Sequence, residues 1–287
     1  MRSHPVRWAA VAALAVALLS VGGAPTSVGA VDEAGTTRAA PATGRLSVVV
    51  VLTDDQTIDA AAQMPYLNSR TDWVTFTRAF VNNSLCCPSR ATILSGQYDT
   101  KTGVMNNSAA QVGQFHDATA LPVALTRAGY RTGLFGKYLN GYPWVFKKGG
   151  TYIPPGWNTW QAAYGPNMYT QYNYSLNDNG VARSYGSASA DYQVDVIRDK
   201  LLSFIRGTPA TQPFFAYFAP TSTHTPWTAA PRHAGIFDGT PMPRFPNQDE
   251  ADVSDKPAWV RAMPRIDLNR QDSLAVSGGR RCPWTTR

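Results

Sequence analysis

The sequence predicts an α/β protein with a mostly parallel central sheet flanked by helices, and three stretches support this class. Residues 46–52 form an almost unbroken apolar, β-branched run, as expected of a strand buried on both faces of a parallel sheet. Residues 131–135 and 213–219 are two further strand-like runs, each preceded by a segment with helical features. Such alternation of helices and buried strands is typical of α/β folds.

Length and composition are those of a globular protein. The 287 residues include 44% hydrophobic and 16% charged residues, which is enough to bury one sizeable core. The formal net charge of +7 is spread among arginines and contains no dense Lys/Arg block. This charge favours anionic substrates and gives no indication of nucleic-acid binding.

The N-terminal 30 residues resemble a secretory signal peptide. Arg2 and Arg7 precede an apolar run at 8–19, and small residues at 28–30 offer a cleavage site. An uncleaved anchor is the alternative, although the run is short for a membrane span. We therefore predict a secreted protein without stable membrane association after signal cleavage, beginning with a flexible lead at 31–44.

Paired carboxylates follow the first strand directly, at Asp54 and Asp55. Open α/β sheets bind their ligands at the carboxyl ends of strands. Two adjacent carboxylates repel each other and need a cation, and oxygen ligands suit Ca²⁺ or Mg²⁺. The alternative is a solvated turn whose acids cap a helix.

The stretch Leu85–Gly96, L-C-C-P-S-R-A-T-I-L-S-G, contains the main candidate for chemistry. Pro88 suits the first helical position and Gly96 the residue past the end, which predicts a helix over 88–95. Cys86 would then lie just before a helix N-terminus, where negative charge is favoured. Arg90 could clamp an oxyanion there. The alternative is a helix start with two buried thiols.

The full pattern C-x-P-S-R-x-x-x-L-S-G resembles the signature of type I sulfatases, which belong to the alkaline phosphatase superfamily. The resemblance implies that a formylglycine-generating enzyme oxidises Cys86 to formylglycine (3-oxoalanine), whose hydrate attacks sulfur. It also implies that Asp54, Asp55 and the Cys86-derived oxygen bind Ca²⁺ or Mg²⁺. The preceding residues W-V-T-F-T-R-A-F-V-N-N-S resemble the N-acetylglucosamine-6-sulfatase branch. Sulfated sugars, such as those of glycosaminoglycans, or small organic sulfates are therefore the implied substrates.

Around this motif the chain alternates between short elements. Met64–Ser69 is predicted as a helix, 74–76 and 79–81 as strand pieces, and 97–107 as a polar loop without an assigned role. Thr119 can cap a helix that runs to about Ala128 and stops at Gly129.

Gly136 and Lys137 follow the strand at 131–135. A lysine is usually a solvated surface residue. Here T-G-L-F-G-K-Y-L-N-G-Y resembles the family's G-K element, which implies that Lys137 binds the sulfate oxygens. Leu139 stands where many sulfatases have a histidine.

An aromatic-rich stretch at 142–174 is predicted to be a long structured loop around the site, with its rings stacking on sugar or packing in the loop. Asn177–Gly180 is predicted to be a hairpin turn and not the family's metal-binding D-N-G. Residues 191–205 have helical periodicity ending at Gly207, before the strand at 213–219.

His224 lies shortly after that last strand. A single histidine is more often structural than catalytic. The pattern P-F-F-A-Y-F-A-P-x-x-x-H-T-P resembles the glucosamine-6-sulfatase sequence, which implies that His224 contacts the scissile ester as proton donor or charge stabiliser.

The resemblance covers 45–268, predicted to be the N-terminal part of a sulfatase catalytic domain, and ends before an atypical basic tail at 269–287. The second metal pair, Asp and Asn, of full-length sulfatases is not found, so a catalytically weak or inactive fragment is one alternative and a phosphoester hydrolase of the same fold another. A parallel sheet without its later strands would expose an apolar edge. Cys86, Cys87 and Cys282 make an odd number, and pairing of Cys87 with Cys282 does not follow from the sequence.

Overall fold

The computed structural model describes residues 44–146, 150–237 and 250–264, which belong to one compact unit, Pro41–Arg287. The predicted signal peptide, nearly all of the flexible lead and the basic tail lie outside the described residues. Within the described part, every helix is too short or too polar to cross a membrane.

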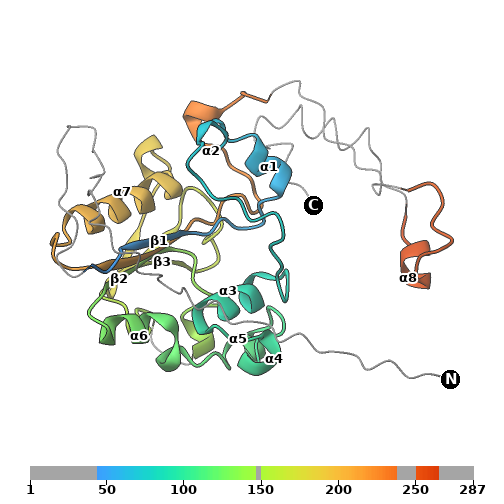
Figure 1. The fold of residues 1–287 in the computed structure, drawn as a ribbon. Helices are drawn as coiled ribbons and strands as arrows, with labels where there is room; N and C mark the ends of the chain where they lie inside the picture. The colour runs from blue at the N-terminus through green and yellow to red at the C-terminus, as the bar shows by residue number, and fades with distance from the viewer. Residues whose placement is uncertain (1–43, 147–149, 238–249, 265–287) are drawn as a thin grey trace. The chain divides into compact units, whose positions relative to one another are not determined.

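The core of the fold is a six-stranded mixed sheet, which confirms the predicted α/β class (Figure 1). Its first four strands in spatial order are parallel, and the last two continue as an antiparallel meander. The spatial order is β1 (Val48–Val51), β6 (Phe214–Ala219), β2 (Arg131–Gly136), β3 (Thr159–Tyr164), β4 (Ser175–Asp178) and β5 (Val181–Ser184).

Helices cover both faces of this sheet. Figure 1 shows α7 (Gln193–Arg206) on one face, and α6 (Leu121–Arg127) and α3 (Cys86–Ser95) on the other. Successive residues of β2 point to opposite faces, so Leu134 packs in the core beneath α3 while Phe135 packs beneath α7. The shorter helices are α1 (Ile58–Ala62), α2 (Pro65–Ser69), α4 (Asp99–Thr102), α5 (Ala109–Val112) and α8 (Ala258–Arg261).

Several predicted elements are confirmed. The strands at 131–135 and 213–219, the helix at 191–205 and the short helix at 64–69 all exist with small shifts of their ends. The predicted turn at 177–180 joins β4 to β5, with Asn179 and Gly180 both at positive φ, as a two-residue hairpin requires. The fold therefore agrees with the prediction that residues 177–180 form a turn and not the family's metal-binding D-N-G.

Other local predictions were wrong. No strand forms at 74–76 or 79–81, and this segment is exposed instead. The aromatic stretch contains a strand, β3, and the predicted polar loop contains α4. Ala120, not Thr119, is the N-cap of α6, because the Thr119 hydroxyl donates to the His116 carbonyl.

β1 is correctly placed but differs from its prediction in burial. It is the outermost strand of the sheet among the described residues, and Val48, Val49 and Val51 are exposed. The apolar run at 46–52 therefore predicted the strand correctly, but the expected burial of both its faces was wrong. The predicted apolar edge is present.

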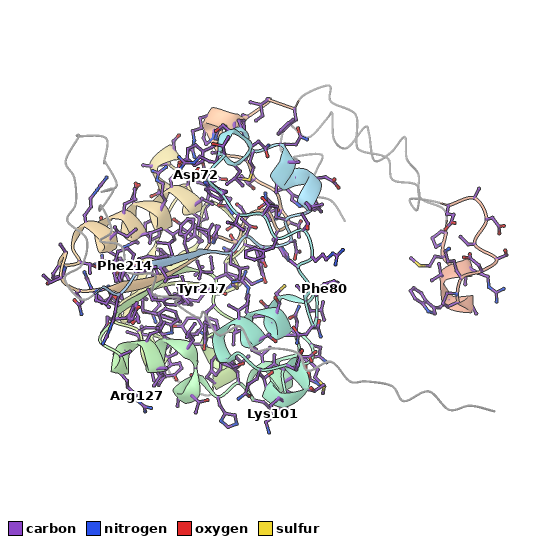
Figure 2. All side chains as sticks on the ribbon, viewed as in Figure 1. Asp72, Phe80, Lys101, Arg127, Phe214 and Tyr217 are labelled. Carbon is purple, nitrogen blue, oxygen red and sulfur yellow. The ribbon has the colours of Figure 1, made fainter. Side chains whose placement is uncertain are left out.

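A second apolar surface lies shortly before α3 in the sequence and consists of five exposed side chains. We call Trp73, Val74, Phe76, Phe80 and Val81 the 73–81 surface. Phe80, whose exposed fraction is 90%, lies away from the sheet residues Phe214 and Tyr217 in Figure 2.

We expect replacement of Phe76 and Phe80 by serine to reduce binding of an apolar fluorescent dye without lowering thermal stability. Exposed substitutions away from packed contacts change the free energy of unfolding by about 0.5 kcal/mol or less. Dye titration and a melting curve of the double variant test this, with Phe135→Ser, in the core, as the destabilising comparison. A strong fall in melting temperature for the surface variant would contradict the exposed placement.

Candidate active site

Helix α3 begins two residues earlier than predicted, at Cys86, so Cys86 lies in its first turn. Pro88 is the third helical residue and is tolerated there because the first amides of a helix lack intrahelical acceptors. Gly96 ends the helix in the left-handed region, at φ +68°, as predicted. Cys86 is thus held at the electropositive end of the helix.

The two neighbouring cysteines have different environments. Cys87 is buried in the core, and its sulfur accepts a hydrogen bond from the Asn140 backbone N–H at 3.2 Å. Burial raises the pKa of the Cys87 thiol to about 11, which keeps it protonated. Cys86 is only partly buried, so of the two it is the sulfur that reagents can reach.

Asp54 forms the centre of a buried ionic cluster. Its two carboxylate oxygens pair with Lys137 Nζ at 2.6 Å and Arg90 Nη2 at 3.1 Å. Arg90 also donates to the Lys137 carbonyl oxygen at 3.0 Å. All three side chains are almost fully buried, so the buried carboxylate has two counterions, and Arg90 has a second acceptor in the Lys137 carbonyl.

Lys137 is held beside this carboxylate by the backbone of β2. A Cβ on Gly136, whose φ is +110°, would collide with the Ala219 carbonyl oxygen, so glycine allows the close approach of β2 and β6. Burial and Arg90 act to lower the pKa of Lys137, but Asp54, Tyr169 and Cys86 outweigh them and the pKa rises. The ammonium therefore remains charged, and the lysine is no solvated surface residue.

His224 and Asp55 meet on the more exposed side of this cluster. His224 Nε2 lies 3.6 Å from an Asp55 carboxylate oxygen, and Nδ1 lies 2.8 Å from the Thr225 carbonyl. A carbonyl can only accept, which assigns a proton to Nδ1 and directs Nε2 toward Asp55. Backbone hydrogen bonds between Asp54 and residues 222 and 223 hold the His224 loop against the end of β1.

Tyr169 belongs to the site although the sequence assigned it no individual role. Its ring stacks on His224 with centroids 4.2 Å apart, and Lys137 Nζ lies 4.8 Å from its centroid. Its hydroxyl donates to Asn140 Oδ1 at 3.1 Å. The aromatic stretch thus contributes one ring that separates two basic groups of the site, in a cation–π geometry.

If the site hydrolyses the sulfate ester that the sequence resemblance implies, Tyr169→Ala should lower turnover by about tenfold or more, since removing the ring frees His224 and opens space beside Lys137. Tyr169→Phe keeps the ring and loses only the hydrogen bond to Asn140, so it should stay within about threefold of wild type. Steady-state kinetics of both variants test this. Equal losses in both would assign the effect to the hydroxyl instead.

Asp54, Asp55 and Cys86 form the candidate metal centre. One ligand atom from each lies within 4.8 Å of the others. Two carboxylates fit Ca²⁺ or Mg²⁺, whereas a thiol sulfur does not, and oxidation of Cys86 would supply an oxygen in its place. Asp55 has a left-handed backbone, φ 59°, a conformation that often marks functional positions.

The fold brings all six predicted site residues to one end of the sheet. Asp54, Lys137 and His224 come after three neighbouring parallel strands, while Cys86 and Arg90 come from α3. The Arg90 guanidinium, predicted to clamp an oxyanion near Cys86, donates its hydrogen bonds to Asp54 and to the Lys137 carbonyl. Sequence reasoning also missed Asn107, whose amide lies 3.7 Å from the Cys86 sulfur.

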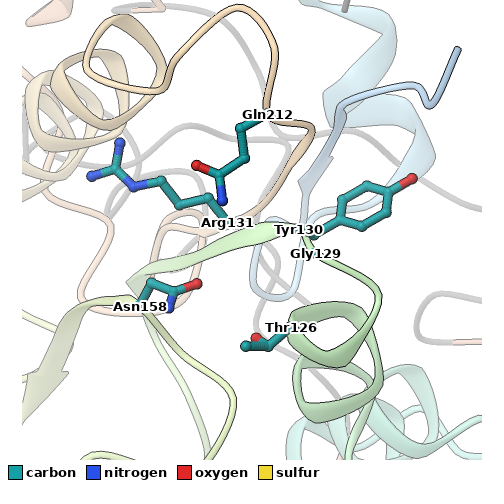
Figure 3. Close-up of a pocket in the computed structure, with 6 residues that line it drawn as sticks. All are labelled: Thr126, Gly129, Tyr130, Arg131, Asn158 and Gln212. Atoms are coloured by element: carbon teal, nitrogen blue, oxygen red, sulfur yellow. The ribbon is translucent and has the colours of Figure 1, made fainter. Parts of the chain in front are cut away.

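A separate pocket of about 330 Å³ lies at the amino-terminal end of β2, away from these strand ends (Figure 3). None of the six predicted residues lines it. Its lining consists of Thr126, Gly129, Tyr130, Arg131, Asn158 and Gln212. This pocket is therefore not part of the candidate active site.

Comparisons with known proteins identify the family. The sulfatase family model matches residues 47–254. Human N-acetylglucosamine-6-sulfatase is 36% identical over 220 residues, which are 72% of this chain and 40% of that protein. An extracellular sulfatase homologue of Drosophila melanogaster is 32% identical over 75% of this chain and 20% of its own length.

A solved structure of a protein with its substrate D-glucosamine-2-N,6-O-disulfate superposes with a TM-score of 0.61 and 24% identity, covering 81% of this chain and 48% of that one. This likeness concerns the fold. The chain spans about 40% of the length of its human relative. With the family model matching most of the chain, the chain belongs to the sulfatase family.

Proposed function

We propose that the chain carries the sulfate-binding and nucleophile-bearing part of a sulfatase that hydrolyses the sulfate ester of a sugar. The observation that supports this most is the juxtaposition of Cys86, at the start of α3, with the buried Asp54–Lys137–Arg90 cluster. Two fixed cations beside a reactive position are suited to a tetrahedral anion. The substrate class rests on the N-acetylglucosamine-6-sulfatase relatives.

Each residue has a distinct role in this proposal. A formylglycine-generating enzyme oxidises the Cys86 side chain to an aldehyde, and the hydrate of that aldehyde supplies the nucleophilic hydroxyl. Ca²⁺ or Mg²⁺ would be held by Asp54, Asp55 and an oxygen on the Cys86 Cβ, and would supply positive charge. Arg90 and Lys137 hold the charge on the sulfate oxygens. His224 acts here as an imidazolium, protonated on both ring nitrogens, and its Nε2, on the open side of the cluster, donates a proton toward the leaving oxygen or stabilises its charge.

Export to the cell exterior is part of the same proposal. The predicted signal peptide supports it, and one relative is named an extracellular sulfatase. An oxidising location is compatible with free Cys87, because its buried, protonated thiol reacts slowly.

Coexpression with a formylglycine-generating enzyme, followed by peptide mass spectrometry across residues 85–90 and activity assays, tests the proposal. We expect conversion of Cys86, hydrolysis of N-acetylglucosamine 6-sulfate and an aryl sulfate, loss of activity in chelator and recovery with Ca²⁺. Faster turnover of an aryl phosphate would favour a phosphoester hydrolase. Converted protein that is folded but inactive with every sulfate ester would refute the proposal.

A further inference from the structure

The loop between α4 and α5 places one side chain against both the start of α3 and the reactive cysteine. Asn107 Oδ1 accepts a hydrogen bond from the Cys87 backbone N–H at 2.9 Å. From the same amide, Nδ2 lies 3.7 Å from the Cys86 sulfur, in a geometry that makes it a donor. Among the described residues, no other side-chain donor is seen within hydrogen-bonding distance of that sulfur.

These two contacts fix the identity of the amide atoms. The Cys87 N–H can only donate, so the atom facing it must be the amide oxygen. The nitrogen must then face Cys86. The first contact also satisfies one of the amides that a helix leaves without an acceptor in its first turn. The orientation of Asn107 is therefore set by the backbone of α3 and does not depend on the state of Cys86.

From this geometry we infer that Asn107 is a further positioning residue of the active site, which donates a hydrogen bond to the group on the Cys86 Cβ. This inference rests on the proposed function for its catalytic consequence. An amide is neutral and is a hydrogen-bond donor whatever the pH. It is therefore suited to orient an oxygen that Cys86 carries after oxidation.

The charged side chains of the site direct their hydrogen bonds elsewhere and not to the group on the Cys86 Cβ. Arg90 directs its hydrogen bonds to Asp54 and to the Lys137 carbonyl, and Lys137 directs its ammonium to Asp54. Both cations are thus oriented by the carboxylate. Asn107 approaches from the α4–α5 loop, so it can hold Cys86 in one rotamer without competing for Asp54.

Two substitutions distinguish the effects of the two hydrogen bonds that the Asn107 amide makes. Asn107→Asp keeps an oxygen for the Cys87 N–H but removes the donor to Cys86, whereas Asn107→Ala removes both contacts. We expect kcat for an aryl sulfate to fall by about 10²- to 10³-fold in both variants, the cost of one donor aimed at a reacting oxygen. We expect the melting temperature to fall only for Asn107→Ala, whose KM should stay within about threefold of wild type.

The neighbouring Asn106 is the matched control. Its side chain is exposed and accepts a hydrogen bond from the Ser108 N–H, which aspartate would also accept. Asn106→Asp and Asn106→Ala should keep kcat within about threefold of wild type. If Asn107→Asp kept full activity while Asn107→Ala lost it, Asn107 would serve only the helix, and the inference would be overturned.

A crystal structure of the converted protein provides a readout that does not depend on turnover. We expect Asn107 Nδ2 within about 3.2 Å of an oxygen on the Cys86 Cβ. An amide turned away from that oxygen would overturn the inference even in an active enzyme. Converted wild-type protein without sulfatase activity would instead refute the proposed function, and the crystal structure would still decide the contact.

Discussion

Cys86→Ala is expected to abolish hydrolysis of sulfate esters, with a loss of about 10⁴-fold or more in kcat, because it removes the residue that we propose as both nucleophile and metal ligand. The variant should fold normally, since Cys86 is only partly buried and, among the described residues, its side chain accepts one hydrogen bond, from Asn107. Turnover of an aryl sulfate by protein coexpressed with the modifying enzyme measures the effect.

Cys87→Ser is the matched control for this experiment. Its hydroxyl can accept the Asn140 N–H that the buried sulfur accepts now, at a modest cost in stability for placing a polar group in the core. We expect activity within about tenfold of wild type and conversion of Cys86 unchanged by mass spectrometry. Full activity of Cys86→Ala, or inactivity of correctly folded and converted Cys87→Ser, would contradict the assignment of the nucleophile.

Asp54→Asn is expected to lower the free energy of unfolding by about 3–5 kcal/mol, the cost of breaking a buried ion pair by removing one partner. The substitution keeps the shape of the side chain but leaves the buried Lys137 and Arg90 without their shared carboxylate. Urea unfolding in the presence of chelator measures this cost, because no metal then contributes to stability.

Asp55→Asn is the comparison that separates two contributions to the free energy of unfolding, that of the buried ion pairs of Asp54 and that of metal binding. The Asp55 side chain is 55% exposed, and its only described ionic partner is His224 at 3.6 Å. We expect no more than about 1 kcal/mol of destabilisation in chelator. Both variants should lose the stabilisation that added Ca²⁺ gives to wild type. Equal stability of the two variants in chelator would show that the buried cluster does not support the fold.

The positions of the site residues that follow strands could be predicted from the sequence, because each strand has a local apolar pattern. The apolar runs before Asp54, Lys137 and His224 gave the strands, and parallel strands bring their carboxyl ends to one edge. The start of α3 was predicted two residues late because the pattern placed Pro88 at the first helical position. Proline is accepted anywhere in the first turn, so it marks a helix start only approximately.

Asn107 and Tyr169 could not be predicted, because their roles depend on contacts between distant segments. Asn107 reaches Cys86 across 21 positions of sequence, and no spacing rule relates a loop amide to a helix start. Tyr169 lies in a stretch rich in aromatic residues, where only the tertiary fold distinguishes the ring beside His224 from its neighbours. The exposure of β1 was missed for a similar reason, since a strand's neighbours determine whether apolar residues are covered.

The outermost position of β1 affects how the candidate site loses its structure on heating. Asp54 and Asp55 follow a four-residue strand that, in the described part of the chain, pairs with the sheet along one side, through β6. Fraying of such a strand costs less free energy than global unfolding. Amide hydrogens of Val48–Val51 should therefore exchange with deuterium faster than those of β2, and gentle heating should displace the two carboxylates of the proposed metal site before the rest of the protein melts.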